Sequence, residues 1–428
     1  MASDNVLIVG SGGREHAIGW KMAQSKHVSK IYFAPGNGGT ANNIDIDHND
    51  IDKLLSFAKR HSNLLTVVGP EEPLSLGIVD AFEKEGLRIF GPRKEAAMLE
   101  TSKAFAKELM HNAGIATADY EIFSDPQQAK DYVITHGRPV VIKANGLAAG
   151  KGVVVCDSIE QAIAVIDNMM TKKEFGVAGS TIVIEERLFG DEVSFIALCD
   201  GKTIMPLASS QDHKRVFNDD KGPNTGGMGA YSPVSMVDAG LHDKIMKDVM
   251  EPAINAMEKR GTPFRGFLYA GIMLEESTKE PHVLEFNVRM GDPECQPIMM
   301  RMKSDLYQYI NAAVDGQLSS MQQIEWKNET AVCVIMAAKG YPGNYEKGKI
   351  IEGLDSYFGP DVAVFHAGTA IDSQGRIITN GGRVLGVTAL GSDVMQAINN
   401  AYSAVRKIRW GENGHHYRTD IARRAIGR

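Results

Sequence analysis

The sequence predicts an α/β protein of several domains: an N-terminal doubly wound parallel sheet, a small α/β lid and a β-rich C-terminal section. A chain of 428 residues exceeds what one hydrophobic core usually organises. Over the first hundred residues, apolar runs such as NVLIVG and LLTVVG alternate with amphipathic segments, which is typical of parallel strands joined by helices. From about residue 330, AVCVIMAAKG opens a stretch with repeated turn signals, which indicates a β-rich domain.

The central part of the chain combines the lid with longer strands. Between 118 and 190, the segments YEIF, PVVIKA, VVVC and STIVIEERL alternate with helical ones, so this unit could move as a lid. FLYAGIMLEE and PHVLEFNVRM resemble adjacent antiparallel strands, and we expect a helix near 238–260 and a loop over 211–229. The expected domains are 1–102, 103–328 with the lid 118–190, and 329–428.

Composition and charge exclude several classes of protein. With 43% hydrophobic and 23% charged residues, the chain is globular rather than disordered, and its net charge of −7 argues against nucleic acid or anionic membranes as partners. The sequence has no apolar stretch of ~18 residues, which a membrane span would need, and its first residues lack the basic region of a signal peptide. We therefore expect a cytoplasmic protein. Four widely spaced cysteines predict buried thiols rather than a zinc site. The basic segment from Arg406 predicts a solvated or domain-bridging face.

The stretch KANGLAAGKGV indicates a phosphate-binding flap. It is not a P-loop, because Asn145 and Gly152 stand where that motif needs glycine and Ser/Thr, and because apolar strands flank it on both sides. Glycines allow backbone N–H groups to approach phosphate oxygens, and lysines supply compact positive charge. The alternative is a hairpin turn without function. The candidate ATP-binding residues here are Lys103, Lys143, Gly146, Gly150, Lys151 and Gly152.

The opening GSGGREH favours a phosphate or phosphosugar site over a purely structural turn. It does not match the dinucleotide fingerprint, because Glu15 replaces the third glycine and no acid follows the second strand. A tight turn at a helix N-terminus still suits a single phosphate. The candidate substrate-binding residues are Gly10, Gly12, Gly13, Arg14 and Glu15.

Two further strands carry acids. In LEFNVRMGDPECQP, Glu285 and Asn287 share one face of a strand, with Arg289 next along it. A carboxylate and an amide oxygen are ligands that Mg²⁺ accepts while leaving places for phosphate oxygens. In IVIEERLFGDE, the backbone near Glu185, Glu186 and Leu188 could bind an adenine edge, and Glu192 could accept from ribose hydroxyls. The alternative for these acids is a solvated strand end.

Together these features are similar to the ATP-grasp superfamily and, within it, to the phosphoribosylamine–glycine ligase family. The resemblance covers nearly the whole chain, in order, through GSGGREH, GPEEPL, IKANGLAAGKGV, SQDHKR, GPNTGGMGAYSP, EFNVRMGDPECQ, KGYPGNY, GGRVLGVTALG and YRTDI. It implies an ATP-grasp fold and the ligation of glycine to 5-phosphoribosylamine through glycyl phosphate, with ATP as co-substrate and Mg²⁺ or Mn²⁺ as cofactor. Met290 and Cys295 depart from the family's usual aromatic residue and threonine, and we expect packing changes there; the alternative for Cys295 is an altered polar contact near the site.

The resemblance also implies roles on the acceptor side. Asp212 would hold an ammonium and Lys214 an anion, with Arg289 as a further catalytic cation, while the loop 211–229 closes over the site. Backbone donors would come from Asn224, Thr225, Gly226, Gly227 and Met228. We expect a monomer or weak homodimer. The alternatives are another ATP-grasp ligase or carboxylase on a related ribonucleotide, and a nucleotide-binding regulatory protein without turnover, which the intact metal strand disfavours.

Overall fold

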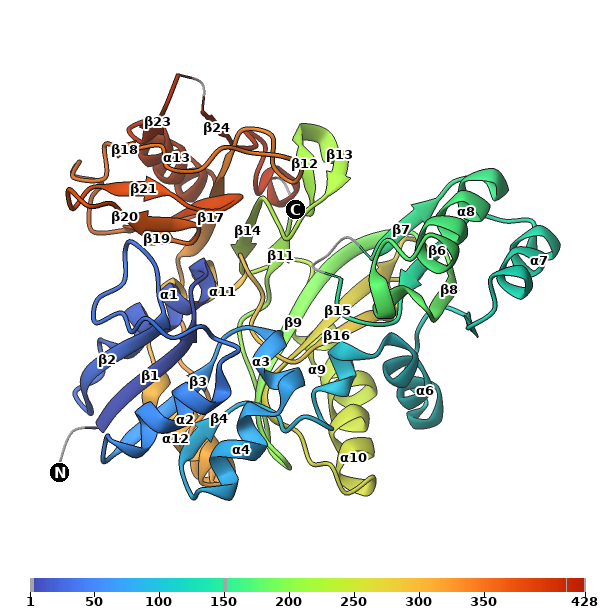
Figure 1. The fold of residues 1–428 in the computed structure, drawn as a ribbon, viewed down its shortest axis with the longest axis horizontal. Coiled ribbons are helices and arrows are strands. Elements are labelled where there is room, and N and C mark those ends of the chain that lie inside the picture. The colour runs from blue at the N-terminus through green and yellow to red at the C-terminus, as the bar shows by residue number, and fades with distance from the viewer. Residues whose placement is uncertain (1–3, 149–151, 413, 427–428) are drawn as a thin grey trace.

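The N-terminal sheet is parallel, as its strand–helix alternation predicts. A computed structural model describes residues 4–148, 152–412 and 414–426. Its first sheet has the order β2-β1-β3-β4, with parallel pairing throughout (Figure 1). Its strands are β1 (Asp4–Gly10), β2 (Val28–Pro35), β3 (Leu64–Val68) and β4 (Arg88–Phe90), and its helices are α1 (Gly13–Met22), α2 (Ile51–Lys59), α3 (Glu71–Leu76) and α4 (Ile78–Lys84).

Both faces of this sheet are covered, which confirms the doubly wound arrangement. Leu7 and Val9 of β1 belong to the core that contains residues of α2 and α4. Val6 and Ile8 alternate with them and belong to a second core, which contains residues of α1. A strand buried on both faces needs a continuous apolar run, and NVLIV supplies it.

The central sheet is antiparallel and has the order β10-β9-β15-β16. Its strands are β9 (Gly190–Asp200), β10 (Ile204–Pro206), β15 (Arg265–Glu275) and β16 (Pro281–Asn287). The expected β15–β16 pair is confirmed. The expected helix near 238–260 is also present, as α9 (Ala239–Ile245) and α10 (Glu251–Lys259) joined by a π-helical turn. One face of the central sheet packs on α11 (Cys295–Arg301) and α12 (Leu306–Val314).

The lid unit projects to one side of the molecule and has its own core (Figure 1). Its sheet has the order β5-β8-β6-β7, with antiparallel pairing. The flap joins β6 to β7 with Lys143 opposite Val153, so the strand–loop–strand interpretation is confirmed. The elements are β5 (Tyr120–Phe123), α7 (Pro126–His136), β6 (Val140–Ala144), β7 (Val153–Cys156), α8 (Ile159–Ile166) and β8 (Ile182–Glu186). Two short helices, α5 (Met98–Thr101) and α6 (Lys103–Ala113), precede it.

The C-terminal part is β-rich, but its main sheet borrows strands from the middle of the chain. The order is β11-β14-β17-β22-β19, with β24 beside β17, and α13 (Val394–Val405) packs on it. The strands are β11 (Gln211–Asp212), β14 (Gly229–Ser232), β17 (Thr330–Ala338), β19 (Val362–His366), β22 (Arg383–Gly391) and β24 (His415–His416). Smaller pairs are β18 (Ile351–Glu352) with β23 (Arg409–Trp410), and β20 (Thr369–Ile371) with β21 (Ile377–Thr379).

The prediction of a plain loop over 211–229 is therefore wrong. Its ends are β11 and the start of β14, and its middle is a hairpin of β12 (Arg215–Phe217) and β13 (Lys221–Asn224). The glycine- and asparagine-rich sequence hides β14, because its partner β17 lies about a hundred residues further along the chain, and β11 pairs in turn with β14.

Two composition-based expectations can be compared with the structure. All four cysteines are free and buried, as expected. Met290 and Cys295 are both buried in the core that contains α11, as expected of packing positions, and the thiol of Cys295 also lies 3.7 Å from the backbone oxygen of Arg14. None of the helices in the described ranges is long and apolar enough to cross a bilayer.

Candidate active site

A cavity of about 720 Å³ lies where the lid, the central sheet, the N-terminal turn and the C-terminal sheet meet. The sequence-predicted residues that line it come from all these parts. They are Arg14, Lys103, Lys143, Gly152, Glu185, Glu186, Leu188, Glu192, Asp212, Lys214, Asn224, Thr225, Gly226, Glu285, Asn287 and Arg289.

The lid end of the cavity contains a buried cluster of charges around Glu185. The Glu185 Oε2 atom lies 2.8 Å from the Nζ of Lys143 and 3.1 Å from the Nζ of Lys107. Lys143 also donates to the backbone oxygen of Leu284 at 2.9 Å, which ties the lid to β16. The other oxygen, Oε1 of Glu185, is buried without a partner among the described residues. A buried acceptor left unpaired is costly, so this atom suits a ligand that brings a donor.

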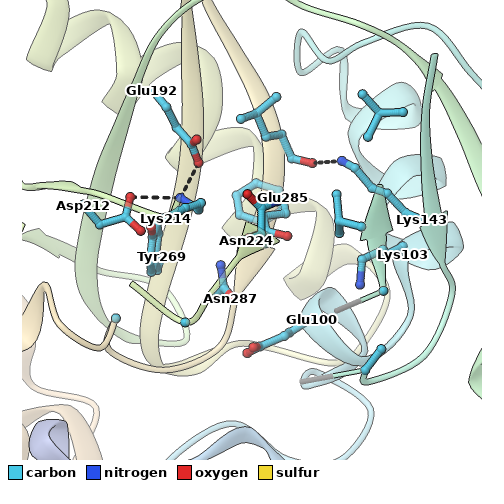
Figure 2. A pocket seen from close by; sticks show the side chains of 18 of the residues that line it. Glu100, Lys103, Lys143, Glu192, Asp212, Lys214, Asn224, Tyr269, Glu285 and Asn287 are labelled. Atoms are coloured by element: carbon cyan, nitrogen blue, oxygen red, sulfur yellow. Dashed lines mark hydrogen bonds and ion pairs between the residues drawn. The ribbon is translucent and has the colours of Figure 1, made fainter. Parts of the chain in front are cut away.

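Glu285 and Asn287 project from the end of β16 toward the middle of the cavity, between the lysines of the lid side and Lys214 (Figure 2). Neither side chain makes a hydrogen bond or ion pair with another residue in the described ranges. Although burial opposes it, the charges of Lys103 and Lys143 hold the pKa of Glu285 below its ordinary value, so the carboxylate is ionised. An ionised carboxylate beside a free amide oxygen fits a hard divalent cation. No three His, Cys, Asp or Glu side chains converge as a metal site anywhere in the described residues, so the fit here rests on Glu285 and Asn287 alone.

Arg289 lies two residues beyond the end of β16 and is held between two carboxylates from α3 and α5. Its Nε lies 2.9 Å from Glu71 of α3, and one of its NH2 groups lies 2.8 Å from Glu100 of α5. The second oxygen of Glu100 accepts the N–H of Val288 at 2.8 Å. Burial and the nearby Glu71 charge raise the pKa of Glu100 to about 7, although Arg289 opposes this shift. The guanidinium therefore reaches the cavity in one fixed orientation.

Lys214 occupies the opposite end of the cavity and is already paired. Its Nζ lies 2.5 Å from Glu192 and 2.9 Å from Asp212 (Figure 2). Burial would lower the pKa of Lys214, but these two carboxylates raise it well above its ordinary value. Next to them, Glu294 accepts from the hydroxyls of Tyr269 at 2.7 Å and Ser194 at 3.1 Å. This end of the cavity thus presents fixed carboxylates that suit an ammonium group.

A second set of charges lies where the N-terminal turn meets β22. Arg383 donates to the backbone oxygen of Gly226 at 2.7 Å and pairs with Asp292 at 3.2 Å. Arg14 lines the cavity from the N-terminal side and donates to the backbone oxygen of Met290 at 3.0 Å. Two arginines from domains far apart in sequence thereby flank one region of the cavity.

Several predicted residues lie outside the cavity lining. Glu15 accepts the N–H of Gly12 at 2.6 Å and pairs with Arg14 at 2.7 Å, so its own carboxylate caps the turn that was expected to hold a phosphate. Met228 is fully buried in a small cluster with Val216 and Ala337. The binding role therefore stays a prediction without a cavity contact for Gly10, Gly12, Gly13, Glu15, Gly146, Gly227 and Met228, and Gly150 and Lys151 lie outside the described residues.

The sequence interpretation missed several lining residues. Four of them, Glu71, Asp292, Glu294 and Arg383, lie inside the quoted segments GPEEPL, GDPECQ and GGRVLG. The resemblance to the family therefore included these residues, but no binding or catalytic role was predicted for them. Lys107 could have been found from its spacing, because it lies four residues after Lys103 and so shares a helix face with it. No local signal marks Tyr269, which reaches the cavity only through the pairing of β15 with β9.

Comparisons with known proteins agree over the whole chain. Residues 4–100 match the N domain of phosphoribosylglycinamide synthetase, residues 101–295 its ATP-grasp domain, and residues 331–424 its C domain. A phosphoribosylamine–glycine ligase of Allochromatium vinosum is 51% identical over 428 residues, covering 99% of each chain. The same enzyme of Rhodopirellula baltica is 49% identical over 436 residues, covering 100% of this chain and 99% of that one.

Solved structures give the same result. The crystal structure of the phosphoribosylamine–glycine ligase of Thermotoga maritima superposes with a TM-score of 0.84 at 36% identity, covering 98% of this chain and 100% of that one. A biotin carboxylase domain of Hydrogenobacter thermophilus, solved with MgADP and bicarbonate, superposes with a TM-score of 0.75 at 16% identity, covering 97% and 92%. That second likeness shows a shared ATP-grasp fold. With matches to all three domains and to full-length relatives, the chain belongs to the phosphoribosylglycinamide synthetase (phosphoribosylamine–glycine ligase) family.

Proposed function

We propose that this chain joins glycine to 5-phosphoribosylamine with consumption of ATP, giving glycinamide ribonucleotide, ADP and phosphate in purine biosynthesis. The observation that carries the proposal is the position of Glu285 and Asn287 between a lysine-rich end of the cavity and an acid-rich end, with no side-chain partner among the described residues. Such a cavity can hold a nucleotide and an amine-bearing substrate on either side of one phosphoryl-transfer position.

The reaction begins at the carboxylate of glycine, which is a poor electrophile because its leaving group would be oxide. Transfer of the γ-phosphoryl group gives glycyl phosphate, which can expel phosphate when the amine of phosphoribosylamine attacks. Negative charge spreads over the transferring oxygens, so fixed cations that face them lower the barrier. Lys103, Lys143 and Arg289, which line the cavity, would take this role.

At the lid end, the backbone between Glu185 and Leu188 would bind the adenine edge, with the unpaired oxygen of Glu185 as a further acceptor. Glu192 lies beside Lys214 at the acid-rich end, so to accept from the ribose hydroxyls it requires the ribose to extend from the lid end toward that end. A divalent cation, Mg²⁺ or Mn²⁺, fits Glu285 and Asn287, and when bound it supplies positive charge beside the phosphate oxygens. Excluding water from this space protects glycyl phosphate from hydrolysis.

At the acid-rich end, Asp212 would hold the ammonium of glycine. Lys214 keeps that carboxylate in place, since it bridges Asp212 and Glu192. Arg14 and Arg383, with the backbone of Asn224–Gly226, would meet the phosphoribosyl group. We further propose that the enzyme works in the cytoplasm as a monomer or weak homodimer, which sedimentation at several protein concentrations would test.

The test is ADP release with the substrates supplied singly and together. We expect the full rate only with ATP, Mg²⁺, glycine and phosphoribosylamine all present, and formation of glycinamide ribonucleotide in step with ADP. Bicarbonate in place of glycine tests the carboxylase alternative, and alanine tests the size of the acid-rich end. An equal rate with either replacement would rule out the assignment.

A further inference from the structure

The C-terminal segment Arg418–Arg424 begins within the motif YRTDI, at its second residue, and contacts the hairpin β12–β13. Thr419 and Asn218 exchange two hydrogen bonds, of 2.6 and 2.9 Å. Asp420 accepts the backbone N–H of Asp219 at 2.9 Å. The hairpin tip is thus held by side chains from a segment about two hundred residues further along the chain.

Arg418 is the centre of this contact. Its guanidinium is 1% exposed, yet it pairs with Asp220 of the hairpin at 2.9 Å and with Asp420 at 2.8 Å. It also donates to the backbone oxygen of Arg215 at 3.1 Å. Arg424 forms a second ion pair with Asp220. A buried arginine with three oxygen partners fixes geometry more firmly than an exposed ion pair does.

The segment is itself anchored on the C-terminal domain. The hydroxyl of Tyr402 in α13 donates to the backbone oxygen of Arg418 at 2.7 Å and accepts the N–H of Ile421 at 3.1 Å. The Nε2 atom of His213 accepts the N–H of Ala422 at 3.3 Å. The contacts therefore run continuously from α13 through the tail to the hairpin.

The hairpin depends on this support. Residues 217–223 are exposed. Within the described part of the chain, the side chains of Asn218 and Asp220 find their partners outside the hairpin only in the segment Arg418–Arg424, while Phe217 contacts His416 of β24. An isolated two-stranded hairpin is marginally stable in water. Yet Arg215, Asp220 and Asn224 all line the cavity, so the shape of the cavity at this end requires the hairpin to stay in place.

We infer that the segment Arg418–Arg424 is a positioning element for the phosphoribosylamine site: it holds the hairpin β12–β13 against the acceptor end of the cavity. This inference rests on the proposed function, because it assigns the hairpin end to phosphoribosylamine and the lid end to ATP. Arg418 does not line the cavity and acts through the hairpin, whereas Arg424 lines the cavity as well.

The test is a comparison of KM values for the substrates in Arg418→Met and in a matched control, Arg423→Met. Arg423 lies in the same segment and carries the same charge, but it is exposed and its side chain makes no hydrogen bond or ion pair with another described residue. Loss of a buried charge-assisted contact should raise the KM for phosphoribosylamine in Arg418→Met by at least ~10-fold. We expect the KM for ATP to change by less than about twofold, because ATP is assigned to the lid end of the cavity and the hairpin to the phosphoribosylamine end. Arg418→Lys should recover part of the loss, and Arg423→Met should match the parent enzyme.

Arg418→Met could unfold the C-terminal domain, so a milder variant is included. Asn218→Ala removes both hydrogen bonds to Thr419 at an exposed position, and we expect the same selective rise in KM at roughly threefold, the scale of a neutral hydrogen bond. Equal increases for ATP and phosphoribosylamine, or unchanged values in folded Asn218→Ala and Arg418→Met, would overturn the inference. If the parent enzyme shows no dependence on phosphoribosylamine, the proposed function fails first, so the two failures are distinct.

Discussion

The two carboxylates that hold Arg289 allow a quantitative test of the site. Glu71→Gln and Glu100→Gln each remove the charge from one partner while keeping the size of the side chain. A hydrogen bond to a charged group contributes about 1.5–3 kcal/mol, which corresponds to a factor of ~10 to ~150 in rate if it is wholly expressed in the transition state. The two partners differ in exposure, with side chains 27% exposed in Glu71 and 8% exposed in Glu100. At about pH 8.5, above the pKa of about 7 of Glu100, both carboxylates are charged. Solvent screening then places Glu71→Gln near the lower limit and Glu100→Gln near the upper one.

The assay is steady-state turnover at saturating ATP, glycine and phosphoribosylamine, with circular dichroism to match the folded fraction. Glu72→Gln is the control. Glu72 is the next residue after Glu71, its side chain is 58% exposed, and its Oε2 lies 3.8 Å from the Nε2 of His48. The double variant Glu71→Gln/Glu100→Gln should lose less than the product of the single effects, since both release the same guanidinium. A kcat for Glu100→Gln within twofold of the parent, or a larger loss in Glu71→Gln, would refute the reasoning.

Three further predictions follow from the same geometry. Glu285→Ala should lower kcat by at least ~10²-fold with an unchanged melting temperature, because it removes a preorganised charge, and unchanged turnover at saturating Mg²⁺ would remove this residue from the metal site. A Cβ at Gly152 would lie 2.6 Å from the Cβ of Ala148 and distort the flap. Gly152→Val should therefore make glycine-dependent ATP hydrolysis exceed product formation. A ratio of ADP to product that stays at one would mean that the flap is only a structural turn. Burial, together with the charges of Arg418 and Arg424, lowers the pKa of His213 from 6.5 to about 3 in the folded protein. As the pH drops below 6.5, the imidazole is protonated in the unfolded chain before it is protonated in the folded one. The free energy of unfolding should therefore fall by up to ~1.4 kcal/mol per pH unit. His213→Asn should show a shallower fall in melting temperature between pH 6.5 and 4, and an equal slope would contradict this.

The sequence predicted the parts of the fold that depend on local periodicity. The parallel N-terminal sheet and the strands around the flap follow from runs such as NVLIV and PVVIKA. The strand that carries Glu285 and Asn287, β16, follows from the alternation of these two residues with apolar ones. What the sequence could not predict is contact between distant segments. The fixing of Arg289 by Glu71 and Glu100, and the entry of β11 and β14 into the C-terminal sheet, depend on pairings across domains that no local pattern encodes.

The glycine-rich start of the chain shows a different limit. GSGGREH has the spacing of an anion-binding turn, and its geometry is indeed that of a turn whose amide meets a carboxylate. The anion is Glu15 itself, two residues after Gly13, so the motif satisfies its own donor. Composition predicts that a turn of this kind needs a negative charge, but it does not say whether the charge is a ligand or a side chain.

The sharing of strands between the middle and the end of the chain sets an order for synthesis on the ribosome. β14 ends at Ser232, and its partner β17 begins at Thr330, so about a hundred residues must be made before the two can pair. At typical translation speeds of about 5–20 residues per second, Gly229–Ser232 waits roughly 5–20 s without its neighbour. During that interval the nascent chain exposes an unpaired edge. Nascent chains stalled shortly before Thr330 should accordingly bind chaperones more strongly than chains stalled after Gly391.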